Sequence, residues 1–261
     1  MRSWTEARVI TAVAAACAVA VTIPACVSAQ KKEIHEKLSA SHVALAGKLI
    51  EQGRMREALT QANMALDEWG KNPDAWFVRG QVDFGLGIYS SAIQDFTTAM
   101  SYRDNFTEAL SWRAWAHSEA GNPDDAERDW KQALKDPRYP NPEKIELNLG
   151  LLCLKDGREA EGMTHLQRAV TLNPAYARGH YELGKVQQEK GDLNAATLSY
   201  EAALGGMHDS ADVNLRLAIV LERRGEGARA KEYFKRVIEL QPDGPEADTA
   251  RDHLKHLDPA T

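Results

Sequence analysis

The chain has 261 residues, and 43% of them are hydrophobic, which is enough to bury a core as one or two ordinary domains. The formal net charge is −6, and acidic and basic residues are interspersed along the sequence. No basic stripe is present, which argues against a nucleic-acid partner.

The first predicted element is a signal sequence. Arg2 and Arg8 precede an apolar run over residues 9–23. A membrane-spanning helix needs about 20 apolar residues, so this shorter run is typical of a secretory signal. We predict a lipoprotein signal peptide over residues 1–25 for the reason given next.

The stretch IPAC, which ends at Cys26, resembles the bacterial lipobox, in which the cysteine sulfur carries a diacylglycerol. This resemblance predicts a lipidated N-terminus and tether over residues 26–38, with the lipid on Cys26 as the one covalent group and no other cofactor. Val27 follows the cysteine, and by analogy with lipoprotein sorting this favours the periplasmic face of the outer membrane. The alternative is an ordinary signal peptide cleaved near residues 27–29.

The rest of the chain repeats itself. Glycines recur with spacings of 34, 34, 36, 34 and 34 residues, at Gly53, Gly87, Gly121, Gly157, Gly191 and Gly225. A period of 34 residues with small and large residues at fixed offsets resembles the tetratricopeptide (TPR) helix–turn–helix repeat. The resemblance implies an all-α fold, a TPR solenoid of six repeats wound as a right-handed superhelix.

The repeat period divides the chain into segments. TPR repeats 1–3 are expected over residues 39–140 and repeats 4–6 over residues 143–244, separated by a proline-rich insert at 141–142. A capping helix and tail are expected over residues 245–261, because a stack of repeats needs an end cap. His253 and His256 on this helix are expected to be solvated rather than to form a metal site.

Two repeats share a charged pair that the others lack. The seventh repeat position is leucine in the other four repeats but arginine in repeats two and three, namely Arg79 and Arg113. Each arginine is followed sixteen residues later by an aspartate, Asp95 or Asp129. We predict ion pairs Arg79–Asp95 and Arg113–Asp129 between the two helices of repeats two and three, because a partly buried arginine needs such a partner.

The sequence contains no phosphate-binding glycine loop, no HExxH, no CxxC and no nucleophile elbow, and its histidines lack metal-ligand spacing. It therefore predicts neither an enzyme nor a metal site nor a small-molecule substrate. What remains is a surface for a protein partner.

The expected partner-binding groove lies on the concave face, where the first helices of TPR repeats present their side chains. Its apolar centre is predicted at Phe77, Phe84, Trp112, Trp115, Leu147, Leu151 and Leu154. The groove is expected to become charged in repeats five and six, through residues such as Arg178, Glu182 and Arg216. The alternative is that the aromatic residues belong to the packed core.

The insert between repeats three and four carries a more specific resemblance. The segment that leads into this insert reads D-P-x-Y-P over residues 136–140, and N-x-G follows at residues 148–150. Six TPR repeats behind a lipobox, with this spacer, resemble the type IV pilus secretin pilotins, the outer-membrane lipoproteins of the PilF/PilW family and the Tgl type.

That resemblance implies a lipoprotein that binds subunits of a PilQ-like type IV pilus secretin and promotes their assembly into the outer-membrane ring. It implies a role in type IV pilus biogenesis and twitching motility. A general periplasmic TPR scaffold that recruits cell-envelope enzymes is the alternative. A soluble periplasmic chaperone is a third possibility, which lipidation of Cys26 would exclude.

Overall fold

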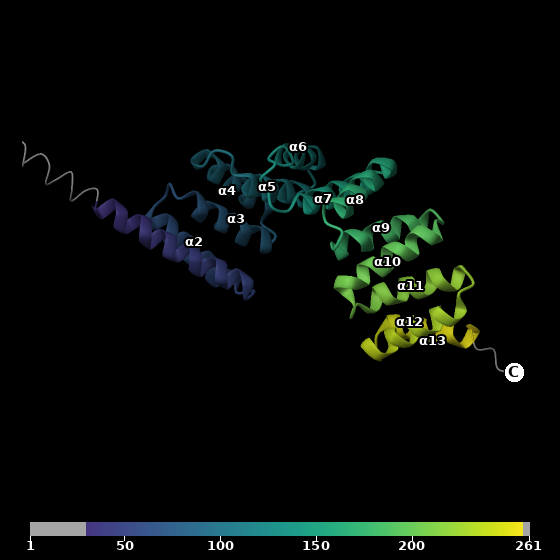
Figure 1. The fold of residues 1–261 in the computed structure, drawn as a ribbon. Coiled ribbons are helices and arrows are strands. Elements are labelled where there is room, and N and C mark those ends of the chain that lie inside the picture. The colour runs from purple at the N-terminus through teal and green to yellow at the C-terminus, as the bar shows by residue number, and fades with distance from the viewer. Residues whose placement is uncertain (1–29, 258–261) are drawn as a thin grey trace, which may run out of the picture. The chain divides into compact units, whose positions relative to one another are not determined.

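The computed structural model describes residues 30–257, so the predicted signal peptide and Cys26 lie outside the described residues. Within this range the chain consists of helices joined by short turns, without a strand (Figure 1). Residues 30–51 are helical. Residues 30–38, which we expected to form part of a tether, therefore belong to the first helix.

The following helices pair into helix–turn–helix repeats. In chain order they are α2 (Met55–Glu68), α3 (Pro73–Gly85), α4 (Tyr89–Tyr102), α5 (Thr107–Glu119), α6 (Pro123–Ala133), α7 (Pro142–Lys155), α8 (Glu159–Leu172), α9 (Ala177–Glu189), α10 (Leu193–Met207), α11 (Ala211–Arg223), α12 (Gly227–Leu240) and α13 (Pro245–Leu257). This arrangement is the predicted TPR solenoid fold.

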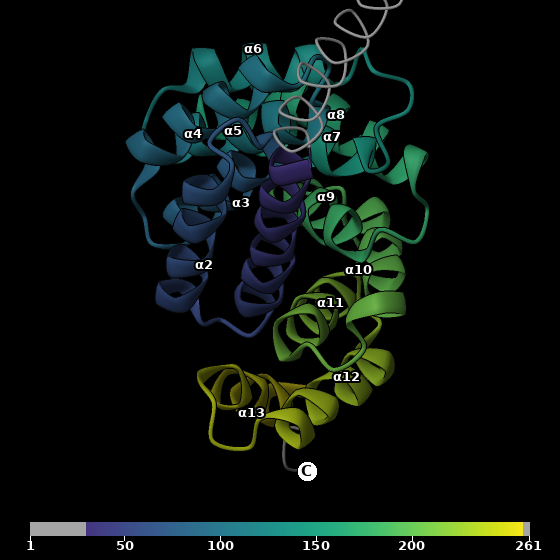
Figure 2. The same ribbon diagram turned by 90° about the vertical axis from the view of Figure 1, so that its left-hand side faces the viewer.

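The described residues form two compact units, which meet in the sequence between Asp129 and Trp130. Within the first unit, α3 packs against α2, α4 and α5. Within the second, each helix from α7 to α13 packs against the next one along the chain. Figure 2 shows these neighbouring helices of each unit side by side.

Turns between the helices of a repeat are made by the periodic glycines. All six have positive φ angles between 72° and 82°, namely Gly53, Gly87, Gly121, Gly157, Gly191 and Gly225. This left-handed backbone conformation is accessible to glycine without a steric penalty, and it commonly ends helices. In repeat two, the amide of Gly87 bonds the carbonyl of Phe84 at 3.0 Å, and that of Ile88 bonds Asp83 at 2.8 Å. The glycine spacing thus marks helix ends.

A second set of glycines allows the two helices of a repeat to approach closely. A methyl group at Gly80 would lie 2.7 Å from the ring of the fully buried Phe96. At Gly184 it would lie 2.8 Å from Tyr200. A small residue on the first helix therefore allows a large residue on the second to pack against it.

One position of the second helix bonds the first helix of its own repeat in five repeats. The pairs are His42–Gln61 at 2.8 Å, Arg79–Asp95 at 2.7 Å, Arg113–Asp129 at 2.7 Å, Glu146–His165 at 2.5 Å and Gln187–Ser199 at 2.6 Å. Both ion pairs proposed from the sequence are among them. The other three pairs were not foreseen, because their first-helix members, His42, Glu146 and Gln187, do not occupy the seventh repeat position where the two arginines lie.

The C-terminal helix α13 packs against α11 and α12 as a cap. It buries Ala247 and Ala250 completely. His253 stacks on Phe234 with ring centroids 5.0 Å apart, and its Nδ1 lies 2.6 Å from Glu222. The expectation that His253 is simply solvated was therefore wrong, because repeat six offers it both an aromatic ring and a carboxylate.

Candidate protein-interaction surface

Four aromatic side chains of the first unit form what we call the aromatic patch: Phe77, Phe84, Trp112 and Trp115. Phe84 lies at its centre, with its ring 5.5 Å from Trp112 in an edge-to-face contact and 4.7 Å from Trp115. The two tryptophan rings are 5.3 Å apart. The patch therefore joins the first helices of repeats two and three.

Helical spacing explains how the patch forms. Phe77 and Phe84 are two turns apart on α3, and Trp112 and Trp115 are one turn apart on α5, so each pair shares a helix face. Phe77 also packs on the buried Phe96 and Phe106, at 5.8 and 5.0 Å. The patch thus has a rigid base in the core.

Exposure differs across the aromatic patch. Trp115 is 40% exposed, whereas Phe77, Phe84 and Trp112 are half-buried. Most of this aromatic surface therefore stabilises the fold, as the core alternative proposed, and Trp115 presents the largest open area. Such exposed tryptophans are common anchors in protein interfaces.

The three predicted groove leucines lie in the second unit and pack differently. Leu147 is only 5% exposed, contrary to the expectation that it lines a groove. It belongs to a core cluster with Leu166 and Leu183, to which Leu151 and Leu154 pack from the outside. Leu147 is therefore part of the core, whereas Leu151 and Leu154 are half-buried like most of the aromatic patch. None of the three is as open as Trp115, so the aromatic patch is the main candidate surface.

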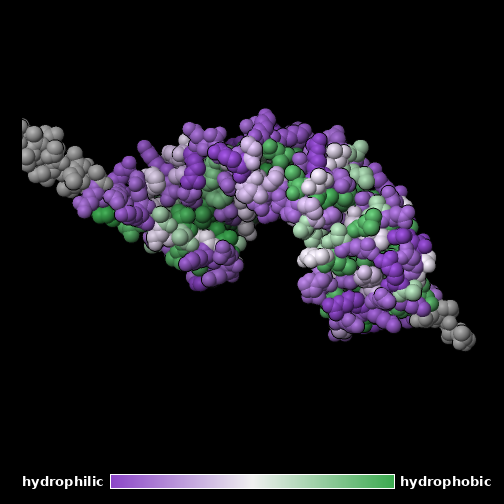
Figure 3. Space-filling view, viewed as in Figure 1, coloured by the Kyte–Doolittle hydropathy of each residue, from purple (hydrophilic) through white to green (hydrophobic). Residues whose placement is uncertain are grey.

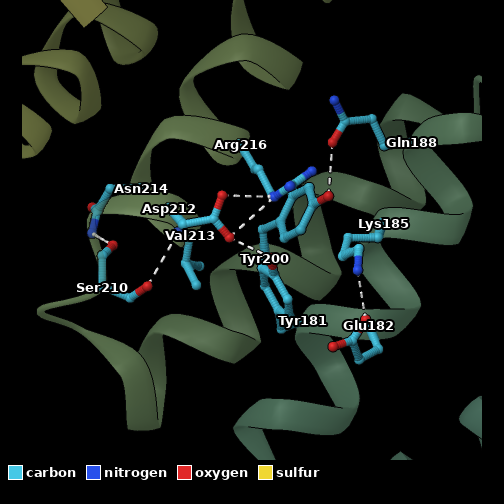
Figure 4. A network of polar contacts seen from close by, with 10 residues as sticks. All are labelled: Tyr181, Glu182, Lys185, Gln188, Tyr200, Ser210, Asp212, Val213, Asn214 and Arg216. Atoms are coloured by element: carbon cyan, nitrogen blue, oxygen red, sulfur yellow. Dashed lines mark hydrogen bonds and ion pairs between the residues drawn. The ribbon is translucent and has the colours of Figure 1, made fainter. Parts of the chain in front are cut away.

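The expected charged region of the second unit is a paired network between α9, α10 and α11 (Figure 4). The hydroxyl of Tyr181 donates to Asp212, and Nε of Arg216 donates to the same carboxylate at 3.0 and 3.2 Å. Arg216 also lies over the Tyr181 ring, 5.7 Å from its centroid. The buried Glu182 accepts a bond from Lys185 at 2.9 Å.

Burial sets the electrostatics of this network. It raises the pKa of Tyr181, and the hydrogen bond to Asp212 raises that pKa further. Burial is also the main cause of the raised pKa of Tyr200, whose hydroxyl donates to Gln188 at 2.7 Å. Both hydroxyls thus stay protonated at neutral pH. Since the charges are paired, the network joins repeats five and six rather than presenting a reactive group.

A hollow of about 660 Å³ opens along α8 in the second unit. Its lining residues are Glu146, Ala160, Met163, Thr164, Gln167, Arg168, Thr171, Leu172 and Lys190. Sequence reasoning missed this feature, because it assigned binding to first helices and α8 is a second helix. Its mixture of apolar and polar side chains does not point to one ligand.

Two further properties concern residues 30–257 as a whole. No three histidine, cysteine, aspartate or glutamate side chains in this range are grouped so that they could hold a metal ion. None of the helices described combines the length and hydropathy that a membrane span requires.

Stacked helix pairs with an exposed aromatic surface are typical of helical-repeat proteins that bind other proteins. The tetratricopeptide repeat family matches residues 44–101, 113–177 and 189–254, and the chain belongs to this family.

Relatives in sequence share parts of the chain. Over 103 residues the chain is 32% identical to human "DnaJ homolog subfamily C member 3", and the matched region covers 40% of this chain and 20% of that protein. Over 179 residues it is 24% identical to "Tetratricopeptide repeat protein 8" of Caenorhabditis elegans, covering 68% of this chain and 35% of that protein. The chain spans well under two thirds of the length of either relative.

Two solved structures resemble nearly the full described chain. PilW, described as a "widely conserved type IV pilus biogenesis factor", has a TM-score of 0.71 at 24% identity, covering 82% of this chain and 98% of PilW. PilF of Pseudomonas aeruginosa has a TM-score of 0.73 at 16% identity, covering 84% and 98%. At such identities the likeness shows a shared fold.

Proposed function

We propose that this chain is a pilotin, an outer-membrane lipoprotein that binds subunits of a type IV pilus secretin and promotes their assembly into a ring. In this proposal it acts as a binding protein and not as an enzyme. Cys26 carries the lipid, and the folded repeats lie on the periplasmic face. The fold shared with PilW and PilF and the D-P-x-Y-P spacer both support the proposal.

The aromatic patch is the observation that carries the binding role. An apolar segment of a partner can cover the open face of Trp115 and the edges of Phe84 and Trp112, whose rings are already held in place by mutual contacts. Little side-chain entropy is then lost on binding, because these rings are ordered before the partner arrives. An amphipathic helix or strand is the expected ligand.

This geometry suggests how assembly is promoted. A secretin subunit must carry apolar segments that end in the membrane, and such segments aggregate in water. The aromatic patch covers one of them on each subunit until neighbouring subunits meet, and subunit contacts then displace it.

The test measures heat- and SDS-resistant secretin multimers by immunoblot in cells that lack this gene and carry a variant. Trp115→Ala is expected to abolish or strongly reduce the multimers while monomers remain. Tyr102→Ala is the matched control, because Tyr102 is also an exposed aromatic residue, 45% accessible, and lies outside the patch. Cys26→Ala tests the anchor separately.

Normal multimers in cells without the gene would overturn the pilotin proposal and favour the envelope scaffold. If deletion removes the multimers but Trp115→Ala does not, the pilotin role stands and the aromatic patch is not the binding surface.

A further inference from the structure

The helix of residues 30–51 starts nine residues before the predicted first repeat at Ser39, and it is fixed to α2. His35 Nδ1 lies 2.5 Å from Glu68, and the Ser39 hydroxyl donates to the carbonyl of Ala65 at 2.7 Å. The N-terminal extension of this helix is therefore held in place by the first repeat.

Beside this fixed face runs a second stripe that nothing in the described part of the chain covers. It consists of Ile34, Leu38, Ser41 and Leu45, which we call the apolar stripe. Ile34 is 52% exposed, Leu38 is 43% exposed and Leu45 is 45% exposed. Their spacing of four, three and four residues places them on one helix face. Figure 3 shows hydrophobic residues at the surface along this helix.

Comparison with later repeats explains why this face is open. Leu45 occupies the seventh repeat position, like Leu149, Leu183 and Leu217, which are only 0%, 3% and 0% exposed. The arginine at this position in repeat two, Arg79, reaches back to Asn63 on the preceding α2, at 3.4 Å. The seventh position thus faces the preceding repeat, and within residues 30–257 no repeat precedes the first. An end of a repeat stack is normally covered or polar, and among the described residues this end is neither.

Charge and chain length point to one occupant. Lys31, Lys37 and Lys48 are exposed and flank the stripe. Lys37 pairs with Glu33 at 2.6 Å, whereas Lys31 and Lys48 have no ion pair within residues 30–257. Apolar residues bordered by lysines are the pattern of helices that lie in the surface of an anionic bilayer. Cys26 precedes residue 30 by four residues, so an acyl chain on it would lie within about 14 Å of the helix.

We propose that the apolar stripe lies against the lipid surface, so that the membrane covers the open end of the repeat stack. The inference rests on the lipid anchor of the proposed function but not on secretin binding. It adds a second membrane contact, made by the folded protein itself, which fixes the orientation of the first repeat on the bilayer.

The test uses the full-length lipoprotein, processed in cells, purified, and reconstituted into vesicles of phosphatidylethanolamine and phosphatidylglycerol. A bimane label on Ser41→Cys reports contact with nitroxide-bearing lipids through quenching, while the buried Cys153 is protected from labelling. The matched control is Ala40→Cys, exposed on another face of the same helix. We expect strong quenching at position 41 and little at position 40.

A triple variant, Ile34→Ser with Leu38→Ser and Leu45→Ser, is expected to lose the quenching at position 41 while it still floats with the vesicles. Its melting curve shows whether the fold is kept. If the labelled Ser41→Cys protein with an intact stripe floats but is not quenched at position 41, the lipid contact is overturned and the anchor stands. If position 41 is not quenched because two copies associate through the stripe, the stripe is a dimer contact and not a lipid contact. Failure to float would overturn the anchor and the inference together, and none of these outcomes depends on secretin.

Discussion

Arg79 and Asp95 join the two helices of repeat two through two parallel hydrogen bonds, each 2.7 Å long. Arg113 and Asp129 repeat this geometry in repeat three, at 2.7 and 3.0 Å. The side chain of Asp95 is only 3% exposed. Each arginine also reaches the preceding repeat, so a single guanidinium bonds groups on two other helices.

The ion pair of repeat two should be costly to break on one side only. We expect Arg79→Ala to lower the free energy of unfolding by about 3 kcal/mol, because it leaves the buried Asp95 carboxylate without its partner. Urea denaturation measures the loss. Arg56→Ala, on the exposed face of α2, is the control and should change little.

Replacing both members with apolar residues, Arg79→Met with Asp95→Leu, should restore much of that stability, since no buried charge remains. Equal losses for Arg79→Ala and Arg56→Ala would show that the pair contributes nothing beyond a surface contact.

Close helix packing in repeat two predicts a strong response at Gly80. The new methyl group of Gly80→Ala would overlap the ring of Phe96, so we expect a loss of about 1–3 kcal/mol. Gly47→Ala is the matched control, since a Cβ there meets no atom within 4 Å. It should stabilise the chain by roughly 0.5–1 kcal/mol, because alanine favours helix. Urea midpoints that move the same way for both variants would contradict this account.

The hydroxyl of Tyr181 should contribute to the contact between repeats five and six. Tyr181→Phe removes its bond to Asp212, and we expect a loss of about 1 kcal/mol in urea denaturation. Tyr233→Phe serves as the control, because the side chain of Tyr233 is half-buried and its hydroxyl forms no hydrogen bond within residues 30–257. A Tyr181→Phe chain as stable as this control would mean that the bond makes no net contribution.

His117 should make stability depend on pH. Burial lowers the pKa of its imidazole, which Asp129 and Asp125 partly oppose while Arg113 and Arg128 reinforce the lowering. The unfolded state, with a pKa near 6.5, then binds a proton more readily than the folded state. Stability should therefore fall as the pH drops from above 6.5 towards the lowered folded value.

Thermal melts of wild type and His117→Gln between pH 8 and pH 5 measure this effect, and the variant should show a shallower slope in that window. An unchanged slope in His117→Gln would assign the pH dependence to other groups.

The sequence predicted the structure well where a residue type has one main structural role. Glycine at a fixed period predicted the repeat, whose turns the same glycines form, and the spacing of Arg79 and Asp95 predicted their contact. It was misleading for Leu147 and His253, whose surroundings depend on which neighbouring helix covers them. Periodicity gives the direction in which a side chain points from its helix, whereas its exposure depends on the next repeat.

The varied polar pairs that join the two helices of a repeat have a consequence for folding. Tandem repeats are so alike that the second helix of one could dock on the first helix of another, which is a common route to misfolding in such arrays. If α4 docked on α7, Asp95 would meet Leu149 and Glu146 in place of Arg79, and a buried carboxylate would lose its cation. The pairs of repeats two and three therefore favour docking of α4 and α6 on a first helix that carries arginine over docking on the first helices of the other repeats.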